Sequence, residues 1–330
     1  MGRTPKCVSC RVLRRACVLV MLTGLIFVTG MFFTGCFSAE DLELRTIEHD
    51  GLERTYYLHV PDTLEDASPV PLVIALHGLL ETGALLAHVT EFNDVADDEQ
   101  FIVAYPNGRF RRFTFERGAK LDDAGFVLSL IEDIAANYAV DRSRVYVTGS
   151  SNGGFLVYQL VCEHPEMFAA AAPVISALPE ETAASYNSSL DMPMIIIHGT
   201  ADPLILYDAQ AVYAGSWRIF DVLSVPETVE FWARQNGCSL NPLVEDMPNT
   251  DPRDNTTATR ATYLDNEGVP KVIHIKVHNG GHNWPGGNHR APGFMIGPQS
   301  KDFSATEEIW EFFALHRRDV SGSAKKPSTR

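Results

Sequence analysis

Short apolar runs alternate with segments of helical periodicity along most of the chain. Four of the runs (LVIAL, IVAY, VYVT and MIII) are almost continuously apolar, which is typical of strands buried on both faces of a parallel sheet. Two earlier runs alternate polar and apolar residues around Asp50-Gly51, and this pattern predicts an antiparallel hairpin at a sheet edge. The predicted strands cover residues 42–47, 54–60, 72–76, 101–105, 144–148, 170–175, 194–197 and 271–277.

Apolar residues that recur at intervals of three or four predict helices between these strands. The predicted helices cover residues 123–138, 226–235 and 304–316. Four apolar residues of the last helix should face the core: Ile309, Phe312, Phe313 and Leu315. Strands that alternate with helices predict an α/β fold, in which helices cover both faces of a mostly parallel, twisted sheet and the antiparallel strands lie at its N-terminal edge. Since no Pro/Ser-rich linker interrupts residues 37–316, we expect one domain there, and a disordered tail over residues 317–330.

The first 36 residues have the pattern of an export signal. Arg11, Arg14 and Arg15 precede an apolar stretch over residues 16–33, as the charged and hydrophobic regions of such signals do. The stretch is also of borderline length for an uncleaved membrane anchor. Because residues 33–36 (FTGC) end like a bacterial lipobox, Cys36 is the candidate for lipidation. The protein is therefore predicted to act outside the cytoplasm, secreted or lipid-anchored at the bacterial cell surface or periplasm.

The charge is distributed unevenly. The whole chain has 27 basic and 42 acidic residues, a net charge of −15. Residues 37–316 carry 17 basic and 41 acidic residues, a net charge of −24. A body this acidic repels phosphate backbones, which argues against nucleic acids and other anionic polymers as ligands.

Cysteine usage leaves two thiols in the body of the protein. Four of the six cysteines lie in or at the end of the leader: Cys7, Cys10, Cys17 and Cys36. The first two form a C-x-x-C, but no second pair or histidine ligand accompanies them, so no metal site is expected. An oxidising compartment permits a disulfide between Cys162 and Cys238, and two free thiols are equally compatible with the sequence.

The strongest local motif lies in residues 144–155 (RVYVTGSSNGGF). Gly149-Ser150-Ser151-Asn152-Gly153 fits G-x-S-x-G directly after a predicted strand and before a helical segment. In this setting the serine occupies a sharp, strained turn, so the residues two before and two after it must be small. We therefore expect Ser151 to be a nucleophile. Ser150 is the competing hydroxyl, but it does not have the required glycine spacing.

A nucleophilic serine needs a base, and the base needs an orienting acid. Asp202 follows the strand MIII, and His282 lies in a glycine-flanked loop after the last predicted strand. The order serine, acid, histidine suits this fold class. His278 also follows Asp202, but it is expected to complete the strand, and His198 is expected to shape the acid's loop.

The oxyanion of an acyl-transfer intermediate requires two backbone donors. One should be the N–H of Asn152, directly after the serine. The other should come from the loop that follows residues 72–76, and we assign it to Leu79. His77, in the same loop, is expected to be structural. Asp122 or Asp123 is expected to cap the helix that follows.

Segments along nearly the whole body resemble one family. They are LVIALHG (72–78), YPNG (105–108), DDAGFVLSLIEDI (122–134), RVYVTGSSNGGF (144–155), IIIHGTADP (195–203), FWARQNGC (231–238), GGHNWPGG (280–287) and FSATEEIWEFF (303–313). In this order they are similar to secreted polyhydroxybutyrate depolymerase-like and feruloyl esterase-like hydrolases, related to carbohydrate esterase family 1. The resemblance implies an α/β-hydrolase fold with Ser151, Asp202 and His282 as catalytic triad. The mechanism of such a triad needs no metal or cofactor. Residues 109–121 lack the Trp-Asn pair usual in the family.

Together these features predict an exported serine esterase that acts through an acyl-enzyme. The expected substrates are feruloylated or acetylated polysaccharides, hydroxyalkanoate oligomers or short-chain esters, and the acidic body favours neutral ones. Trp284 and Tyr105 are candidates for the substrate pocket. We expect a monomer that meets a membrane only through its leader. The alternatives are a serine peptidase on the same fold and a non-catalytic surface lipoprotein.

Overall fold

The computed structural model describes residues 42–64, 68–116, 118–214, 216–288 and 293–319. The predicted export signal, with Cys36, lies outside these ranges, as does the tail beyond residue 319. Within the described residues no helix is both long and apolar enough to cross a membrane.

Twelve strands are present in the described residues. They are β1 (Glu43–His49), β2 (Leu52–His59), β3 (Val70–Leu76), β4 (Ile102–Pro106), β5 (Val140–Ser150), β6 (Ala170–Val174), β7 (Met194–Gly199), β8 (Ala211–Ala214), β9 (Trp217–Asp221), β10 (Leu243–Asp246), β11 (Thr257–Leu264) and β12 (Pro270–His278). Ten of them form one sheet in the order β1-β2-β4-β3-β5-β6-β7-β12-β11-β10. The six from β4 to β12 run parallel, and antiparallel strands extend the sheet at both ends.

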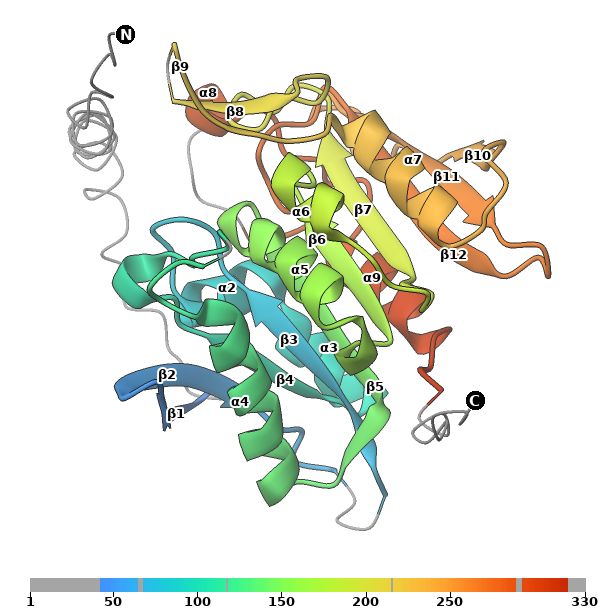
Figure 1. Cartoon of the computed structure of the whole chain (residues 1–330). Coiled ribbons are helices and arrows are strands. Elements are labelled where there is room, and N and C mark those ends of the chain that lie inside the picture. Colours follow the sequence, from blue (N-terminus) through green and yellow to red (C-terminus); the bar gives the residue numbers. More distant parts are fainter. Residues whose placement is uncertain (1–41, 65–67, 117, 215, 289–292, 320–330) are drawn as a thin grey trace, which may run out of the picture.

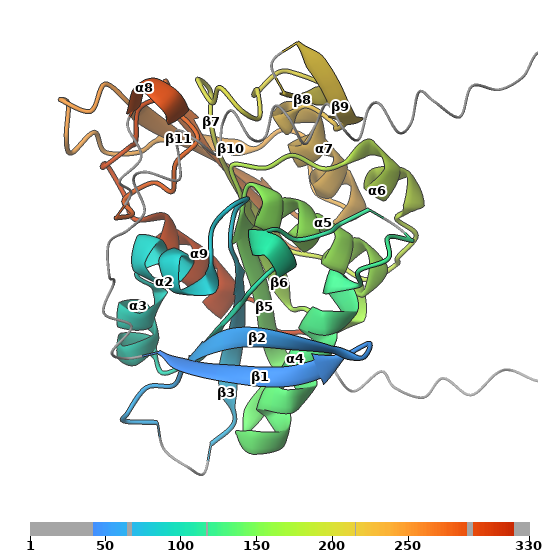
Figure 2. The same cartoon turned by 90° about the vertical axis from the view of Figure 1, so that its left-hand side faces the viewer.

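Helices cover both faces of this sheet, as Figures 1 and 2 show. The α-helices are α2 (Gly83–Thr90), α3 (Phe92–Glu99), α4 (Asp123–Asn137), α5 (Asn152–Glu163), α6 (Glu180–Ser185), α7 (Val225–Gln235), α8 (Gly293–Ile296) and α9 (Ala305–Ala314), and η1 (Arg109–Arg111) and η2 (Pro165–Met167) are 3-10 turns. Helices α4, α5 and α7 pack on one face, and α2, α3 and α9 on the other. The three-layer α/β architecture predicted from the sequence is confirmed.

The central strands are buried on both faces. Along β3, Leu72, Ile74 and Leu76 belong to the core under α4, α5 and α7. Val73 and Ala75 belong to the core under α2, α3 and α9. This arrangement explains why the strand has a continuous apolar run and no alternation.

The hairpin predicted at the N-terminal edge is also present. Strands β1 and β2 pair antiparallel up to His49 opposite Leu52, so Asp50 and Gly51 form a two-residue turn. Both turn residues have positive φ (52° and 70°), the geometry that suits the twist of a hairpin. Strand β2 pairs with β4 and joins the hairpin to the parallel strands.

Several elements differ from the sequence expectations. The antiparallel strands β10 and β11 at the opposite edge and the separate β8–β9 hairpin were not predicted. Helix α9 ends at Ala314, and Leu315, expected to face the core, is 64% exposed because it caps the helix. Residues 317–319 belong to the predicted disordered tail, yet the N–H of Arg318 donates to the carbonyl of Ser143 (2.9 Å).

The possible disulfide is not formed, since Cys162 and Cys238 are both free thiols. Cys162 is buried on α5, and Cys238 follows α7 with its Sγ 3.7 Å from the carbonyl oxygen of Tyr263. Burial raises the pKa of Cys162 to about 12 and that of Cys238 to about 11. Both side chains therefore stay protonated and behave as core residues.

Candidate active site

Ser151 occupies a strained turn between β5 and α5. Strand β5 ends at Ser150 and the helix begins at Asn152, so a single residue reverses the chain. Its backbone has φ 52° and ψ −113°, a conformation that non-glycine residues rarely adopt. The N–H of Ser151 donates to the carbonyl of Val174 on β6 (3.0 Å), which holds the turn in place. This is the backbone that the G-x-S-x-G motif predicts.

The two glycines of the motif are required by close backbone packing. A Cβ on Gly153 would lie 2.2 Å from the carbonyl oxygen of Leu76 at the end of β3. A Cβ on Gly149 would lie 2.8 Å from the carbonyl carbon of Gly153. The two glycines therefore let the first turn of α5 pack directly on the end of β3, and no larger residue fits at either position.

Asp202 and His282, 80 residues apart in the sequence, form a buried pair. His282 Nδ1 lies 2.7 Å from Asp202 Oδ2, and since a carboxylate only accepts, the imidazole donates. The other carboxylate oxygen accepts the N–H groups of Leu204 (2.8 Å) and Ile205 (2.9 Å). This bond keeps one proton of the imidazole on Nδ1, so that in the neutral form of the ring Nε2 can accept a proton.

The charge of Asp202 is favoured by its surroundings. Burial alone would raise the pKa of this carboxyl, but the charge and hydrogen bond of His282, together with His198 and the N–H of Ile205, hold the pKa below its usual value. His198 Nε2 is 2.9 Å from the carbonyl of Ile205 and 3.4 Å from Asp202 Oδ2. Burial lowers the pKa of His198, so it stays neutral. Its predicted role in shaping the loop is confirmed, and His278 completes β12 as predicted.

Ser151, Asp202 and His282 follow the C-terminal ends of β5, β7 and β12, which are parallel strands of one sheet. The fold therefore brings all three to the same edge, where α/β sheets hold their ligand sites. The hydroxyl of Ser151 makes no hydrogen bond within the described part of the chain, and His282 is bonded through its side chain to Asp202. Nucleophile–base hydrogen bonds are often long in ligand-free sites.

The loop after β3 lies beside the turn that carries Ser151. His77 Nδ1 donates to the carbonyl of Gly78 (2.7 Å), and His77 Nε2 accepts the N–H of Gly108 (2.9 Å). Burial lowers the pKa of His77 to about 4, so it is neutral and structural, as predicted. Among the described residues, no hydrogen bond engages the N–H of Leu79 or of Asn152. Both predicted oxyanion donors are therefore available to a ligand.

Glu81 was not identified from the sequence, although it lies four residues after His77 in the same loop. Its Oε2 accepts the N–H of Gly78 (2.8 Å), and its own N–H donates back to the carbonyl of Gly78 (3.3 Å). Burial raises the pKa of Glu81, while the bond from Gly78 and the charges of His282 and Arg111 partly oppose this effect. Glu81 thus closes the loop that carries Leu79 and lies close enough to His282 to influence it electrostatically.

The segment after β4 connects this loop to helix α5. The carbonyl of Arg111 accepts the N–H of Leu80 (2.7 Å). Phe113 exchanges two hydrogen bonds with the side chain of Asn152, through its N–H (2.7 Å) and its carbonyl (3.0 Å). The ring of Phe113 packs on His77, with centroids 4.5 Å apart.

Both residues of the Asp122-Asp123 pair are structural, as expected. Asp122 caps α4 by accepting the N–H of Gly125 (2.8 Å). Asp123 forms a buried ion pair with Arg54 on β2 and accepts the N–H of Thr114 (2.7 Å). Asp123 therefore connects the segment that contains Thr114 to strand β2 of the edge hairpin.

Trp284 and Tyr105 lie in the hydrophobic core, which corrects their interpretation as substrate-pocket residues. Trp284 is 3% exposed, and its indole N–H donates to Thr306 (3.1 Å). Tyr105 is fully buried on β4, and its hydroxyl donates to Asn93 (2.7 Å). Each aromatic ring thus packs inside while its polar atom finds an internal partner.

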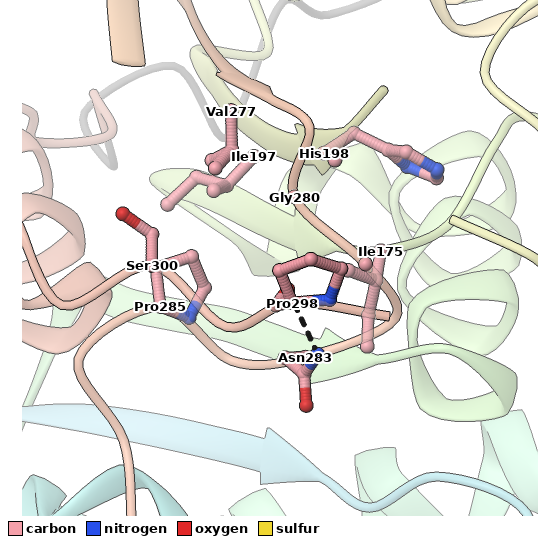
Figure 3. Close-up of a pocket in the computed structure, with 11 residues that line it drawn as sticks. Ile175, Ile197, His198, Val277, Gly280, Asn283, Pro285, Pro298 and Ser300 are labelled. Atoms are coloured by element: carbon pink, nitrogen blue, oxygen red, sulfur yellow. Dashed lines mark hydrogen bonds between the residues drawn. The ribbon is translucent and has the colours of Figure 1, made fainter. Parts of the chain in front are cut away.

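A small cavity lies behind the loop that carries His282, and Figure 3 shows its lining. Its volume is about 10 Å³, comparable to the space that one water molecule needs. Asn283 closes one side by donating to the carbonyl of Pro298 (3.2 Å). The cavity is too small for an ester substrate.

One group of side chains in the described residues could approach a metal ion. His49 Nε2 lies 3.5 Å from Asp122 Oδ2 and 3.8 Å from Asp50 Oδ2. Both carboxylates are exposed, and the group lies at the β1–β2 turn and the start of α4. These distances are those of ordinary ion pairs.

Residues 53–227 match the family model described as Esterase PHB depolymerase. A relative from Nocardia uniformis subsp. tsuyamanensis, named as the esterase NocK, is 28% identical to this chain over 79% of each protein. Poly(3-hydroxyalkanoate) depolymerase C of Paucimonas lemoignei is 33% identical over 40% of this chain, which spans 33% of that protein. The acetyl xylan esterase from Aspergillus awamori has the same fold, with a TM-score of 0.57 and 18% identity over 83% of this chain and 99% of that one.

Proposed function

We propose that this chain, which belongs to the Esterase PHB depolymerase family and is a carboxylic ester hydrolase, acts as an exported serine esterase with Ser151 as nucleophile. His282 serves as the general base and Asp202 orients it. The N–H groups of Leu79 and Asn152 form the oxyanion hole. The substrates we propose are feruloyl or acetyl esters of polysaccharides, or hydroxyalkanoate esters.

The backbone of Ser151 is the observation that carries this proposal. A non-glycine residue at φ 52° and ψ −113° costs about 1–3 kcal/mol, and such strain persists where the surrounding structure enforces it. Gly149, Gly153 and the bond to Val174 enforce it here. The hydroxyl of Ser151 has no hydrogen-bond partner within the described residues. It follows the C-terminal end of β5, at the same edge of the sheet as the Asp202–His282 pair.

The mechanism follows from these contacts. Ser151 Oγ attacks the ester carbonyl carbon and transfers its proton to His282 Nε2, while Asp202 stabilises the imidazolium. The carbonyl oxygen becomes an oxyanion that accepts from the two free N–H groups. When the tetrahedral intermediate collapses, the alcohol leaves and takes the proton from His282. The acyl group stays on Ser151 as an acyl-enzyme. Water, deprotonated by His282, attacks the acyl carbon; the bond to Ser151 Oγ then breaks, Ser151 Oγ takes the proton back from His282, and the acid is released.

The substrate and the location rest on the relatives and on the leader. The family description and the depolymerase relative name hydroxyalkanoate polyesters, and the structural neighbour names acetylated xylan. An enzyme that meets such polymers outside the cell needs the proposed export signal, and lipidation at Cys36 would hold it at the cell surface. No cofactor or metal enters the proposed steps.

The direct test compares Ser151→Ala with the matched neighbour variant Ser150→Ala. We expect Ser151→Ala to lose hydrolysis of p-nitrophenyl acetate while its thermal unfolding stays unchanged, and Ser150→Ala to remain active. If Ser151→Ala kept its activity, the nucleophile assignment would be wrong. If the wild-type protein hydrolysed no ester but still bound xylan or polyester, it would be the non-catalytic binding protein. A panel of methyl ferulate, acetylated xylan and hydroxybutyrate oligomers then ranks the substrates.

A further inference from the structure

An exposed basic cluster lies on the segment that follows β4. Arg109, Arg111 and Arg112 are all exposed, and Phe110 between them is 80% exposed. The guanidinium of Arg109 lies over the ring of Phe110, with its carbon 5.2 Å from the ring centroid. Phe110 and Arg111 have positive φ (56° and 60°), so the backbone turns sharply at the tip of the cluster. We call these four residues the arginine tip.

The arginine tip is unusual because its charges are unpaired. Exposed arginines elsewhere have an acidic partner, as Arg142 has Glu132 and Arg234 has Glu230. Within the described ranges, none of the three arginines of the tip forms an ion pair. Residues 37–316 carry a net charge of −24, so the three unpaired arginines stand out on an acidic body. The charges are thus free to meet a ligand.

The position of the tip connects it with the catalytic residues. The carbonyl of Arg111 accepts the N–H of Leu80, next to the proposed oxyanion donor Leu79 (2.7 Å). Two residues on, Phe113 is bonded to the side chain of Asn152, the other proposed donor. The positive charge of Arg111 also lowers the pKa of His77 and opposes the raised pKa of Glu81, so its field reaches the loop.

We propose that the arginine tip is a subsite for a carboxylate that the substrate carries apart from the ester bond being cleaved. This inference rests on the proposed esterase function and narrows its substrate class. Guanidinium groups bind carboxylates through two parallel hydrogen bonds and lose little hydration in doing so. The exposed ring of Phe110 offers an apolar surface to the sugar or methylene carbons next to that carboxylate.

The overall charge indicates what kind of anion fits. The acidic body repels a densely charged polymer. A single carboxylate on a neutral carrier is attracted by the three arginines beside it, and salt screens the repulsion from acidic residues farther away. Two sources supply such a group: a uronic acid branch on an acetylated xylan, and the free terminal carboxylate of a hydroxyacid oligomer.

The experiment compares pairs of substrates that differ only in this carboxylate. One arm uses acetylated glucuronoxylan oligosaccharides before and after chemical reduction of the uronic acid. The other uses a hydroxybutyrate trimer with a free terminal carboxylate and the same trimer capped as a terminal amide. The measured quantity is the ratio of kcat/KM for the acidic member to that for the neutral member, for the full protein at low and high NaCl. Cleavage of p-nitrophenyl acetate shows separately that the enzyme is an active esterase.

We expect a ratio well above one in one arm, which identifies the source, and a lower ratio in high salt. Because each exposed guanidinium–carboxylate contact is weak, all three arginines are replaced together, as Arg109→Gln, Arg111→Gln and Arg112→Gln, and the ratio should fall about tenfold. The control Arg253→Gln removes another exposed positive charge from a different part of the surface and should leave the ratio unchanged. The inference is overturned if an active wild-type enzyme shows no preference in either arm, or if the triple variant keeps the preference. An inactive wild-type enzyme would instead refute the proposed function.

Discussion

Replacement of Asp202 by Asn tests the proposed orientation of the catalytic histidine. In the structure one carboxylate oxygen of Asp202 accepts two loop N–H groups, and the other accepts His282 Nδ1. Asn has one acceptor oxygen. If that oxygen keeps the two loop bonds, the amide NH₂ faces the imidazole and can only donate. His282 must then accept at Nδ1 and carry its proton on Nε2, where it cannot remove the proton of Ser151.

The magnitude follows from the tautomer. The loop keeps its hydrogen bonds and the substitution preserves volume, so the fold should persist while nearly all molecules hold the wrong tautomer. The corresponding substitution in serine proteases lowers kcat about 10⁴-fold. We expect a loss of this order, which corresponds to about 5.5 kcal/mol of transition-state stabilisation.

The assay measures kcat with p-nitrophenyl acetate at neutral pH, together with thermal unfolding. Asp208→Asn is the matched control, because Asp208 is exposed in the same segment and has no hydrogen bond among the described contacts. Its activity should stay near that of the wild-type enzyme. Activity of Asp202→Asn within tenfold of the wild type, with an intact fold, would refute the tautomer argument.

Three further predictions concern the loops around the site. Gly153→Ala places a Cβ 2.2 Å from a backbone oxygen of β3, so we expect a melting temperature lower by several degrees and a large loss of activity; unchanged melting would contradict the packing argument. Burial lowers the pKa of His77 and His274 to about 4, so the unfolded chain takes up protons below pH 6.5 that the folded chain does not. The free energy of unfolding should therefore fall by about 2 kcal/mol for each histidine between pH 7 and pH 5, as urea titrations can measure, and a flat profile would exclude it. Glu81→Ala removes the carboxylate that accepts the N–H of Gly78, so the loop that carries Leu79 should loosen and kcat with p-nitrophenyl acetate should fall; an unchanged kcat would show that Glu81 does not position this loop.

The central part of the fold was predictable because its signals are local and strong. The runs in β3, β4, β5 and β7 are apolar at nearly every position, since both faces of these strands are buried. The strands of the opposite edge lack this signal. All four residues of β10 are exposed, and four of the eight residues of β11 (TATRATYL) are polar, so neither has the composition of a buried strand.

The candidate site residues could be selected from the sequence for a similar reason. Ser151, Asp202 and His282 are each marked by short motifs at strand ends, and parallel strands bring their ends together. Trp284 and Tyr105 lack such a marker. An aromatic ring with one polar atom suits a core with an internal partner as well as a pocket, and only the structure shows Thr306 and Asn93 as those partners.

The arginine tip shows a different limit. A net charge describes the field far from the molecule, whereas a ligand at the site meets the nearest charges. Composition alone favours neutral substrates. The placement of Arg109, Arg111 and Arg112 beside the oxyanion loop could be recognised only once Leu80 and Asn152 were seen to hold that segment.

The measurement that tests the central claim most directly is the site of covalent labelling by a fluorophosphonate. The wild-type protein is treated with the reagent, digested and analysed by mass spectrometry. The account predicts a single adduct on Ser151, formed at a rate that falls together with activity in Asp202→Asn. An adduct on Ser150, or an enzyme that hydrolyses esters and takes up no label, would contradict it.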